Sequence, residues 1–279
     1  MEVKINKAIL TDGARAESVA DEATELTDAD EILGAALDVG EYMLKYGGEV
    51  HRVEDTVHRI CIAYGATDAD IFAITSLILA TVRMKDGTYA SHIRRVSPAS
   101  THLARLEELN RLSRRICSSP IPPKEVRETV VKIRDMRPVP VWLAYVGAAL
   151  TTSAFSVFFG GTLYDGLAAA VIGILMTLIS RINHVKINEM ARLFIMSLIS
   201  GTLSALSASV GFGDNVDKIA IGTIMLVIPG LAFGNALRDL LCGEIIAGSM
   251  RFIQAVLAAL MIALGYMAAF IMCSFLPFT

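Results

Sequence analysis

The sequence predicts an α-helical integral membrane domain of five transmembrane helices, preceded by a cytoplasmic α+β domain with a small sheet. Charge is divided unevenly: 19 basic and 22 acidic residues fall in residues 1–140, whereas residues 141–279 hold only six of each. The second half also contains five apolar runs, each long enough to cross a bilayer as a helix. A hydrophobic share of 54% excludes both a disordered chain and an ordinary soluble enzyme.

Residues 1–31 carry nine acidic and three basic residues and few large apolar ones, so residues 1–30 are predicted to form a flexible acidic tail. Residues 31–137 are predicted to form the cytoplasmic α+β domain. Helical spacing of apolar residues predicts helices over 29–46, 50–64, 103–117 and 122–135. Residues 70–84 predict one or two strands, and the turn signal Asp86-Gly87 predicts a hairpin into a strand over 88–96.

The predicted second helix holds the densest polar chemistry of the soluble half: Glu49, His51, Arg52, Glu54, Asp55, His58 and Arg59. Three interpretations stay open. These residues can form a solvated face with local ion pairs. A buried Glu49–Arg52–Asp55 network can instead brace the domain or contact the membrane half, with Glu54 beside it. His51, Asp55 and His58 can also act as an acid–base or metal-binding group, because they share one helix face.

Several classes of site are not supported. The four cysteines are far apart, which favours neither a disulfide framework nor a zinc site. No phosphate-binding loop, dinucleotide fingerprint, zinc-hydrolase motif or nucleophile elbow is present. A net charge of −3 gives no sign of a nucleic-acid partner. We therefore expect no enzyme activity, no catalytic residue, no metal and no cofactor.

Residues 141–279 are predicted to form the membrane domain, in contact with the lipid bilayer. The five spans expected are 141–159, 164–180, 193–210, 219–237 and about 252–276. Basic residues precede the first span, follow the second and lie between the fourth and fifth, whereas the other ends have few. By the positive-inside rule, the N-terminus is cytoplasmic and the C-terminus lies outside the cell (inner) membrane.

Two groups of residues in the membrane half are candidates for solute binding. Ser200 and Ser204 belong to a serine series that recurs every three or four residues, which indicates either close helix packing or a hydroxyl-lined path for a polar solute. In the fourth span, Pro229 and Gly230 allow a helix break, and such breaks are where carriers bind substrates. Asn235, Arg238 and Asp239 follow. Arg238 can clamp a carboxylate, or it can lie at the membrane interface beside Asp239.

Two blocks of sequence resemble the bacterial threonine/serine exporter family. One runs from Gly48 to Thr56 with Ala63-Tyr64-Gly65, together with the Asp86-Gly87 hairpin and the helix around residues 106–113. The other runs from Leu226 through Pro229-Gly230 to Gly248. Members of this family have about ten spans, so a chain with five is similar to the larger component of the split, two-protein form, one example of which is a succinate exporter.

The resemblance implies a subunit of a secondary exporter of small carboxylate metabolites, either threonine and serine or a succinate-like dicarboxylate. Because many carriers are built from two halves, we expect a smaller membrane subunit, or a second copy of this chain, to supply the remaining helices. The alternatives are a regulatory or scaffold subunit whose cytoplasmic domain senses a ligand, and a membrane-anchored hydrolase.

Overall fold

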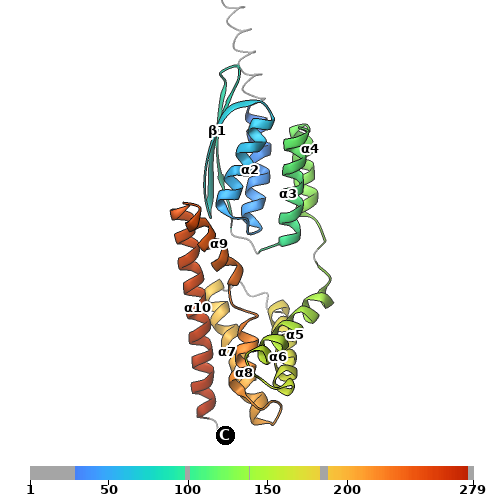
Figure 1. Ribbon diagram of the computed structural model, residues 1–279, viewed down its shortest axis with the longest axis vertical. Helices are drawn as coiled ribbons and strands as arrows, with labels where there is room; N and C mark the ends of the chain where they lie inside the picture. The colour runs from blue at the N-terminus through green and yellow to red at the C-terminus, as the bar shows by residue number, and fades with distance from the viewer. Residues whose placement is uncertain (1–28, 98–100, 138, 183–187, 276–279) are drawn as a thin grey trace, which may run out of the picture. The chain divides into compact units, whose positions relative to one another are not determined.

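The computed structural model describes residues 29–97, 101–137, 139–182 and 188–275 (Figure 1). The predicted acidic tail lies outside these residues except for its last two positions. The chain divides into two compact units. The first unit comprises Met1–Met136 with Asn235–Met250, and the second comprises Arg137–Gly234 with Arg251–Thr279. Each is described by itself below.

The first unit begins with a helix over residues 29–45. It continues with α2 (Val50–Ala63), β1 (Ala66–Ile74), β2 (Leu77–Met84), β3 (Tyr89–Arg95), α3 (Leu103–Ser118) and α4 (Pro123–Arg134). These elements confirm the predicted helices and hairpin, and they divide the predicted 70–84 segment into two strands. Gly47 ends the first helix with a φ of +92°, a conformation that favours glycine because it lacks a Cβ.

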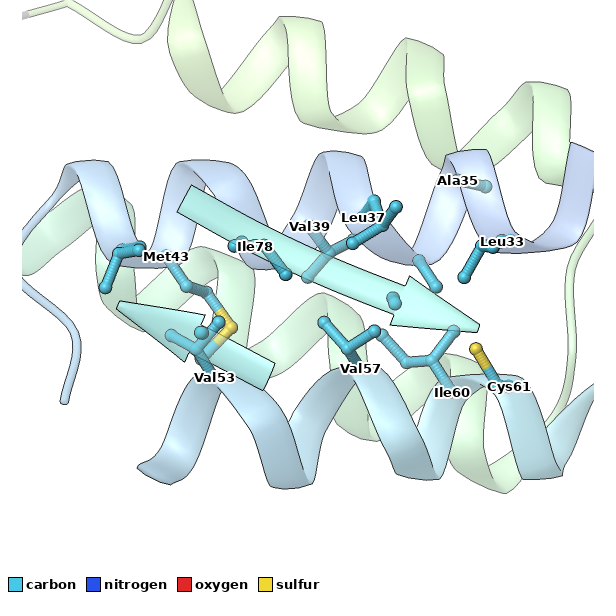
Figure 2. Close-up of a cluster of buried hydrophobic side chains, with 14 of the residues drawn as sticks. Leu33, Ala35, Leu37, Val39, Met43, Val53, Val57, Ile60, Cys61 and Ile78 are labelled. Carbon is cyan, nitrogen blue, oxygen red and sulfur yellow. The ribbon is translucent and has the colours of Figure 1, made fainter. Parts of the chain in front are cut away.

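The sheet is antiparallel in the order β1-β2-β3. Ile78, Ala80 and Val82 alternate along β2 and are all buried, so one face of the sheet points into the core. Apolar residues of the helix over 29–45 and of α2 fill the same core (Figure 2). A Cβ on Gly40 would lie 2.5 Å from Val57 of α2, which shows how closely the two helices approach.

Residues 235–250 belong to the first unit although they follow the membrane segments in sequence. They comprise most of α9 (Gly230–Leu241) and the first turns of α10 (Ile245–Ser274). Ala247 joins the same hydrophobic core as the sheet, and Ala236 is completely buried. A Cβ on Gly248 would lie 3.1 Å from the Ala236 carbonyl oxygen, so a larger residue there would push α9 and α10 apart.

The second unit contains α5 (Val141–Phe158), α6 (Leu163–Ile182), α7 (Glu189–Ser209), α8 (Val216–Ile224) and the greater part of α10. Small residues let these helices pack closely. Thr152 of α5 is buried, and its atoms would lie within 2.6 Å of a Cβ added to Gly173 of α6 or Gly222 of α8. A Cβ added to Gly265 of α10 would lie 2.6 Å from the Phe194 carbonyl oxygen of α7. Close backbone approach of this kind is typical of helices in a bilayer.

Within the described residues, four helices are long and apolar enough to cross a membrane: Val141–Phe158, Leu163–Arg181, Glu189–Ser209 and Ile245–Ser274. The chain is therefore a helical membrane protein with a small sheet. The predicted fourth span, residues 219–237, is not one helix, because α8 ends at Ile224 and α9 begins at Gly230. Pro229 has no N–H to donate to the preceding turn, which explains the break. The count of five continuous spans is not confirmed.

Asp165 ties the start of α6 to the segment before α8. The Asp165 carboxylate is completely buried and accepts hydrogen bonds from the backbone N–H groups of Thr162, Asp214 and Asn215 and from the Asn215 side chain, at 2.7–2.9 Å. The Thr162 hydroxyl accepts from the Asp165 N–H in return, which completes a capping box. Four donors offset the free energy lost when this carboxylate leaves water.

Glu54 is a partly buried carboxyl group within the first unit. Its Oε1 accepts a 2.6 Å hydrogen bond from the backbone N–H of Ala73, so it joins α2 to β1. Burial raises the pKa of Glu54 above 4.5; the Ala73 hydrogen bond opposes this rise, and the Glu244 and Asp239 carboxylates add to it. The positive charge of His51 lowers the pKa of Glu54. The folded chain therefore holds the Glu54 proton more tightly than the unfolded chain does.

We expect Asp165→Asn to lower the free energy of unfolding by about 1–3 kcal/mol, because one carboxylate oxygen becomes an N–H₂ group facing N–H donors. Thermal unfolding of the purified protein in detergent would measure this as a lower midpoint. The matched control is Asp217→Asn, since Asp217 is exposed and pairs only with Lys218 among the described residues. Equal midpoints for both variants would contradict the assigned role of Asp165.

We expect Glu54→Gln to raise thermal stability at pH 8 and to have little effect at pH 4. The free energy of unfolding falls as pH rises from about 4.5 through the raised pKa of Glu54, because the folded state binds the proton more tightly. Glutamine keeps the oxygen that accepts from Ala73 and removes the charge. Unfolding midpoints at the two pH values check this, with exposed Glu128→Gln as the control. An equal effect of Glu54→Gln at both pH values would contradict it.

Candidate functional site

The break between α8 and α9 exposes backbone atoms in a helical bundle. Leu226 and Val227 donate to the carbonyls of Thr223 and Ile224, which closes α8 with tight turns. No donor in the described part of the chain reaches the carbonyl oxygens of Leu226 and Val227. Pro229 and Gly230, predicted as part of a solute site, lie at the end of this break. A discontinuous helix with free carbonyls can bind a cation or an N–H donor without first breaking a helix.

Three further predicted solute ligands lie on α9 and contact other parts of the first unit. The Asn235 amide donates to the carbonyl of Gly47 at 3.0 Å. Arg238 pairs with Glu49, with 2.6 Å between guanidinium and carboxylate. Asp239 accepts from the backbone N–H of Val50 at 3.1 Å. These three contacts join one face of α9 to the Gly47–Val50 turn, which precedes α2.

Asp239 acts as a cap for α2 from another part of the sequence. Glu49 occupies the N-cap position of α2, yet its side chain makes no capping hydrogen bond. The Asp239 carboxylate, completely buried, instead accepts from the first N–H of α2. A carboxylate is favourable there because the unpaired N–H groups and the helix dipole make a helix N-terminus positive. Sequence reasoning named Asp239 but could not identify this partner, which is 189 residues away.

Within the described ranges, the other polar residues predicted in the soluble half contact partners other than Glu49. Arg52 donates to the Asn110 side chain, and Glu54 accepts from Ala73. Asp55 forms an exposed pair with Arg59, and His58 contacts the carbonyl of Ala69. No group of three or more potential metal ligands occurs among the described residues. Each of these α2 residues therefore makes its own contact: Arg52, Glu54, Asp55 and His58.

Ser200 and Ser204 are buried in the second unit and lie in a cluster of hydroxyl groups. The Ser200 hydroxyl lies 2.7 Å from that of Tyr266 on α10, which lies 3.0 Å from the Thr223 hydroxyl on α8. Ser204 donates to the Ser200 carbonyl at 2.9 Å and lies 3.5 Å from Thr223. Sequence reasoning missed Tyr266 and Thr223. A phenol within a long apolar run is a signal that could have indicated Tyr266, since its hydroxyl needs a partner there.

Three known proteins with similar sequences are named as exporters or as a transporter subunit. The "Probable threonine/serine exporter" of Mycobacterium tuberculosis is 25% identical over 84% of this chain and 45% of its own length. The "Threonine/serine exporter" of Corynebacterium glutamicum is 24% identical over 84% of this chain and 50% of its own length. The "Probable succinate transporter subunit YjjP" of Klebsiella aerogenes is 25% identical over 83% of this chain and 90% of its own length. No solved structure matches this chain.

The relatives thus differ in how much of them the chain covers. The chain spans about half the length of the two threonine/serine exporters and nearly all of the protein named as a transporter subunit. The model of the threonine/serine exporter family, ThrE, matches residues 35–272, which include most of both compact units and the break between α8 and α9. The chain therefore belongs to the threonine/serine exporter family.

Proposed function

We propose that this chain is one subunit of a secondary-active exporter of small carboxylate metabolites in the inner membrane. The observation that carries the proposal is the break between α8 and α9, where Pro229 and Gly230 interrupt an apolar segment and leave carbonyl oxygens free. Discontinuous helices are where secondary carriers bind their solutes. The absence of a phosphate-binding loop from the sequence favours coupling to an ion gradient over ATP hydrolysis.

A second membrane subunit completes the proposed transporter. The chain covers 90% of a relative named a transporter subunit but only about half of the relatives named as exporters. If a smaller membrane protein supplies the remaining helices, this chain matches the whole of a subunit but only half of a single-chain exporter. Pairing of two copies of this chain is the other arrangement, and the experiment below separates the two.

The proposed topology has five crossings, with the N-terminus in the cytoplasm and the C-terminus outside. Four crossings are the long apolar helices. The fifth is discontinuous and comprises α8, the residues up to Pro229 and the beginning of α9. The basic residues before α5 and at the end of α6 favour this orientation by the positive-inside rule.

The polar contacts of α9 support a coupling role for Arg238 in preference to solute binding. Glu49 already neutralises the Arg238 guanidinium, so a solute carboxylate would have to displace it. Asn235 and Asp239 also have protein partners. We therefore assign Asn235, Arg238 and Asp239, with Glu49, the task of holding α9 against the start of α2. A regulatory action of the soluble domain on export would pass through these contacts.

The hydrolase alternative has less support. Asp55 pairs with Arg59, and the ring of His58 contacts the Ala69 carbonyl. These contacts within the protein give both residues a structural role. We propose that the chain is a transport subunit and not an enzyme.

We expect efflux of preloaded labelled threonine, serine or succinate when the chain is expressed together with a small membrane protein encoded beside it. The cells must lack their own exporters for these solutes. Efflux only in the presence of the partner establishes a two-component exporter, and efflux from the chain alone indicates a homo-oligomer. The absence of efflux of all three solutes under both conditions would contradict the proposed function.

We expect Glu49→Gln and Arg238→Ala to reduce export to a similar extent, and the exchange Glu49→Arg with Arg238→Glu to restore most of it. The reason is that each single change breaks one ion pair, which the exchange rebuilds. Rates of solute efflux measure the effect at equal amounts of membrane-inserted protein. The exposed pair Asp55–Arg59, changed to Asn and Ala, is the matched control and should have little effect.

The same variants test the competing interpretation of Arg238. If Arg238 were a direct solute ligand, Glu49→Gln would leave export intact, because it only frees the guanidinium. The exchanged pair would then stay inactive. That combination of results would reject the coupling role.

A further inference from the structure

A small pocket lies within the second unit beside the break between α8 and α9. Its volume is about 350 Å³, which is near the lower end for small-molecule sites. Met176, Thr177, Ser180 and Arg181 of α6 line one part of it. Met196 of α7 and Leu226 and Val227 of the break line the rest. A pocket of this size suits a metabolite of a few carbon atoms and is too small for a nucleotide.

Among the described residues that line this pocket, Arg181 is the only charged one. Its guanidinium lies over the ring of Tyr145 on α5, 5.9 Å from the ring centroid, which favours one orientation of the side chain. No carboxylate among the described residues pairs with Arg181, whereas Lys218 of the same unit pairs with Asp217. An arginine without an acidic partner at a pocket can bind a carboxylate with two parallel hydrogen bonds.

The pocket lining also includes residues with hydrogen-bond acceptors. Leu226 and Val227 lie in the break, and no donor in the described ranges reaches their carbonyl oxygens. Free backbone carbonyls bind ammonium groups and cations. The hydroxyls of Thr177 and Ser180 add groups that can accept or donate; that of Thr177 donates to the Gly173 carbonyl and keeps its acceptor positions.

We propose that this pocket binds a small α-amino acid, with its carboxylate on Arg181 and its ammonium group on the carbonyls of Leu226 and Val227. One cation and a set of neutral acceptors complement a zwitterion. A dicarboxylate would need a second cation, and among the residues that the structure describes Arg181 alone supplies one to the pocket lining. The proposal deepens the proposed function and rests on it, because it assigns a solute site and a solute class to the same exporter.

Direct binding to the purified full chain in lipid nanodiscs tests the site. The probes are L-threonine, L-serine, threoninamide, which lacks the carboxylate, and succinate. We expect the unchanged chain to bind threonine or serine at least ~10-fold more tightly than threoninamide and succinate. Arg181→Ala should lose this preference, and Arg181→Lys should retain part of it, because lysine keeps the charge without the bidentate geometry.

Arg192→Ala is the matched control. Arg192 is an exposed arginine of α7 that does not line the pocket, so its loss removes the same charge from the same unit. It should bind threonine as the unchanged chain does. Equal binding by Arg181→Ala and Arg192→Ala would overturn the proposal, as would tighter binding of succinate than of threonine by the unchanged chain.

A cysteine-protection measurement covers the case in which Arg181→Ala fails to fold. With the four native cysteines replaced, Ser180→Cys places a thiol in the pocket that a maleimide can modify. We expect threonine to slow this modification at least ~3-fold, and threoninamide to leave it unchanged. Modification at the same rate with and without threonine would overturn the site.

Efflux assays separate failure of the site from failure of the proposed function. If the chain and its partner export a solute and Arg181→Ala exports it equally well, the pocket is not the solute site but the exporter assignment stands. If the unchanged chain exports nothing with or without its partner, the exporter assignment fails, and the binding data then decide alone whether the pocket takes an amino acid.

Discussion

The buried carboxylate of Asp239 is the interaction on which the arrangement of the first unit depends. A carboxylate with no exposed surface must have partners, since burying it unpaired would cost several kcal/mol. The Asp239 carboxylate accepts a hydrogen bond from the first N–H group of α2. Glu49, the N-cap residue of α2, makes no side-chain capping hydrogen bond. The Asp239 contact pairs a buried carboxylate with the N-terminus of a helix, and together with the contacts of Asn235 and Arg238 it holds α9 on the start of α2.

The break at Pro229 lies shortly before the point at which the chain passes from the second unit to the first. Residues 235–250 belong to the first unit, whereas residues up to Gly234 belong to the second. A continuous helix over residues 219–237 would cross the boundary between the two units as one rigid element. The proline interrupts it, so α8 packs with α5, α6 and α7 while α9 makes its polar contacts elsewhere. The polar residues on α9 serve protein contacts, and the free carbonyls of the break remain for other ligands.

Close backbone packing and hydrogen bonds between hydroxyl groups join the helices of the second unit. Thr152 lies where Gly173 and Gly222 allow the backbones of α6 and α8 to approach α5. Tyr266 joins α7, α8 and α10 through Ser200 and Thr223. Lipid tails are as apolar as leucine, so burial of leucine against leucine gains little in a bilayer, and short-range packing and hydrogen bonds decide which helices associate. Ser200 and Ser204 of the serine series on α7 take part in this packing.

The sequence by itself determined the elements of this protein. Helical spacing predicted the helices of the soluble half, and β-branched residues with the Asp86-Gly87 turn signal predicted its hairpin. The long apolar runs predicted α5, α6, α7 and α10. All of these signals are local. Pro229-Gly230 also indicated the break. Only the tertiary structure decided the partners. From the sequence alone, Arg238 and Asp239 could be solute ligands or residues that contact other parts of the protein, since their partners Glu49 and Val50 lie 189 residues away. Arg181 drew attention only as a topology signal, because the pocket beside it forms when α6, α7 and the break come together in space.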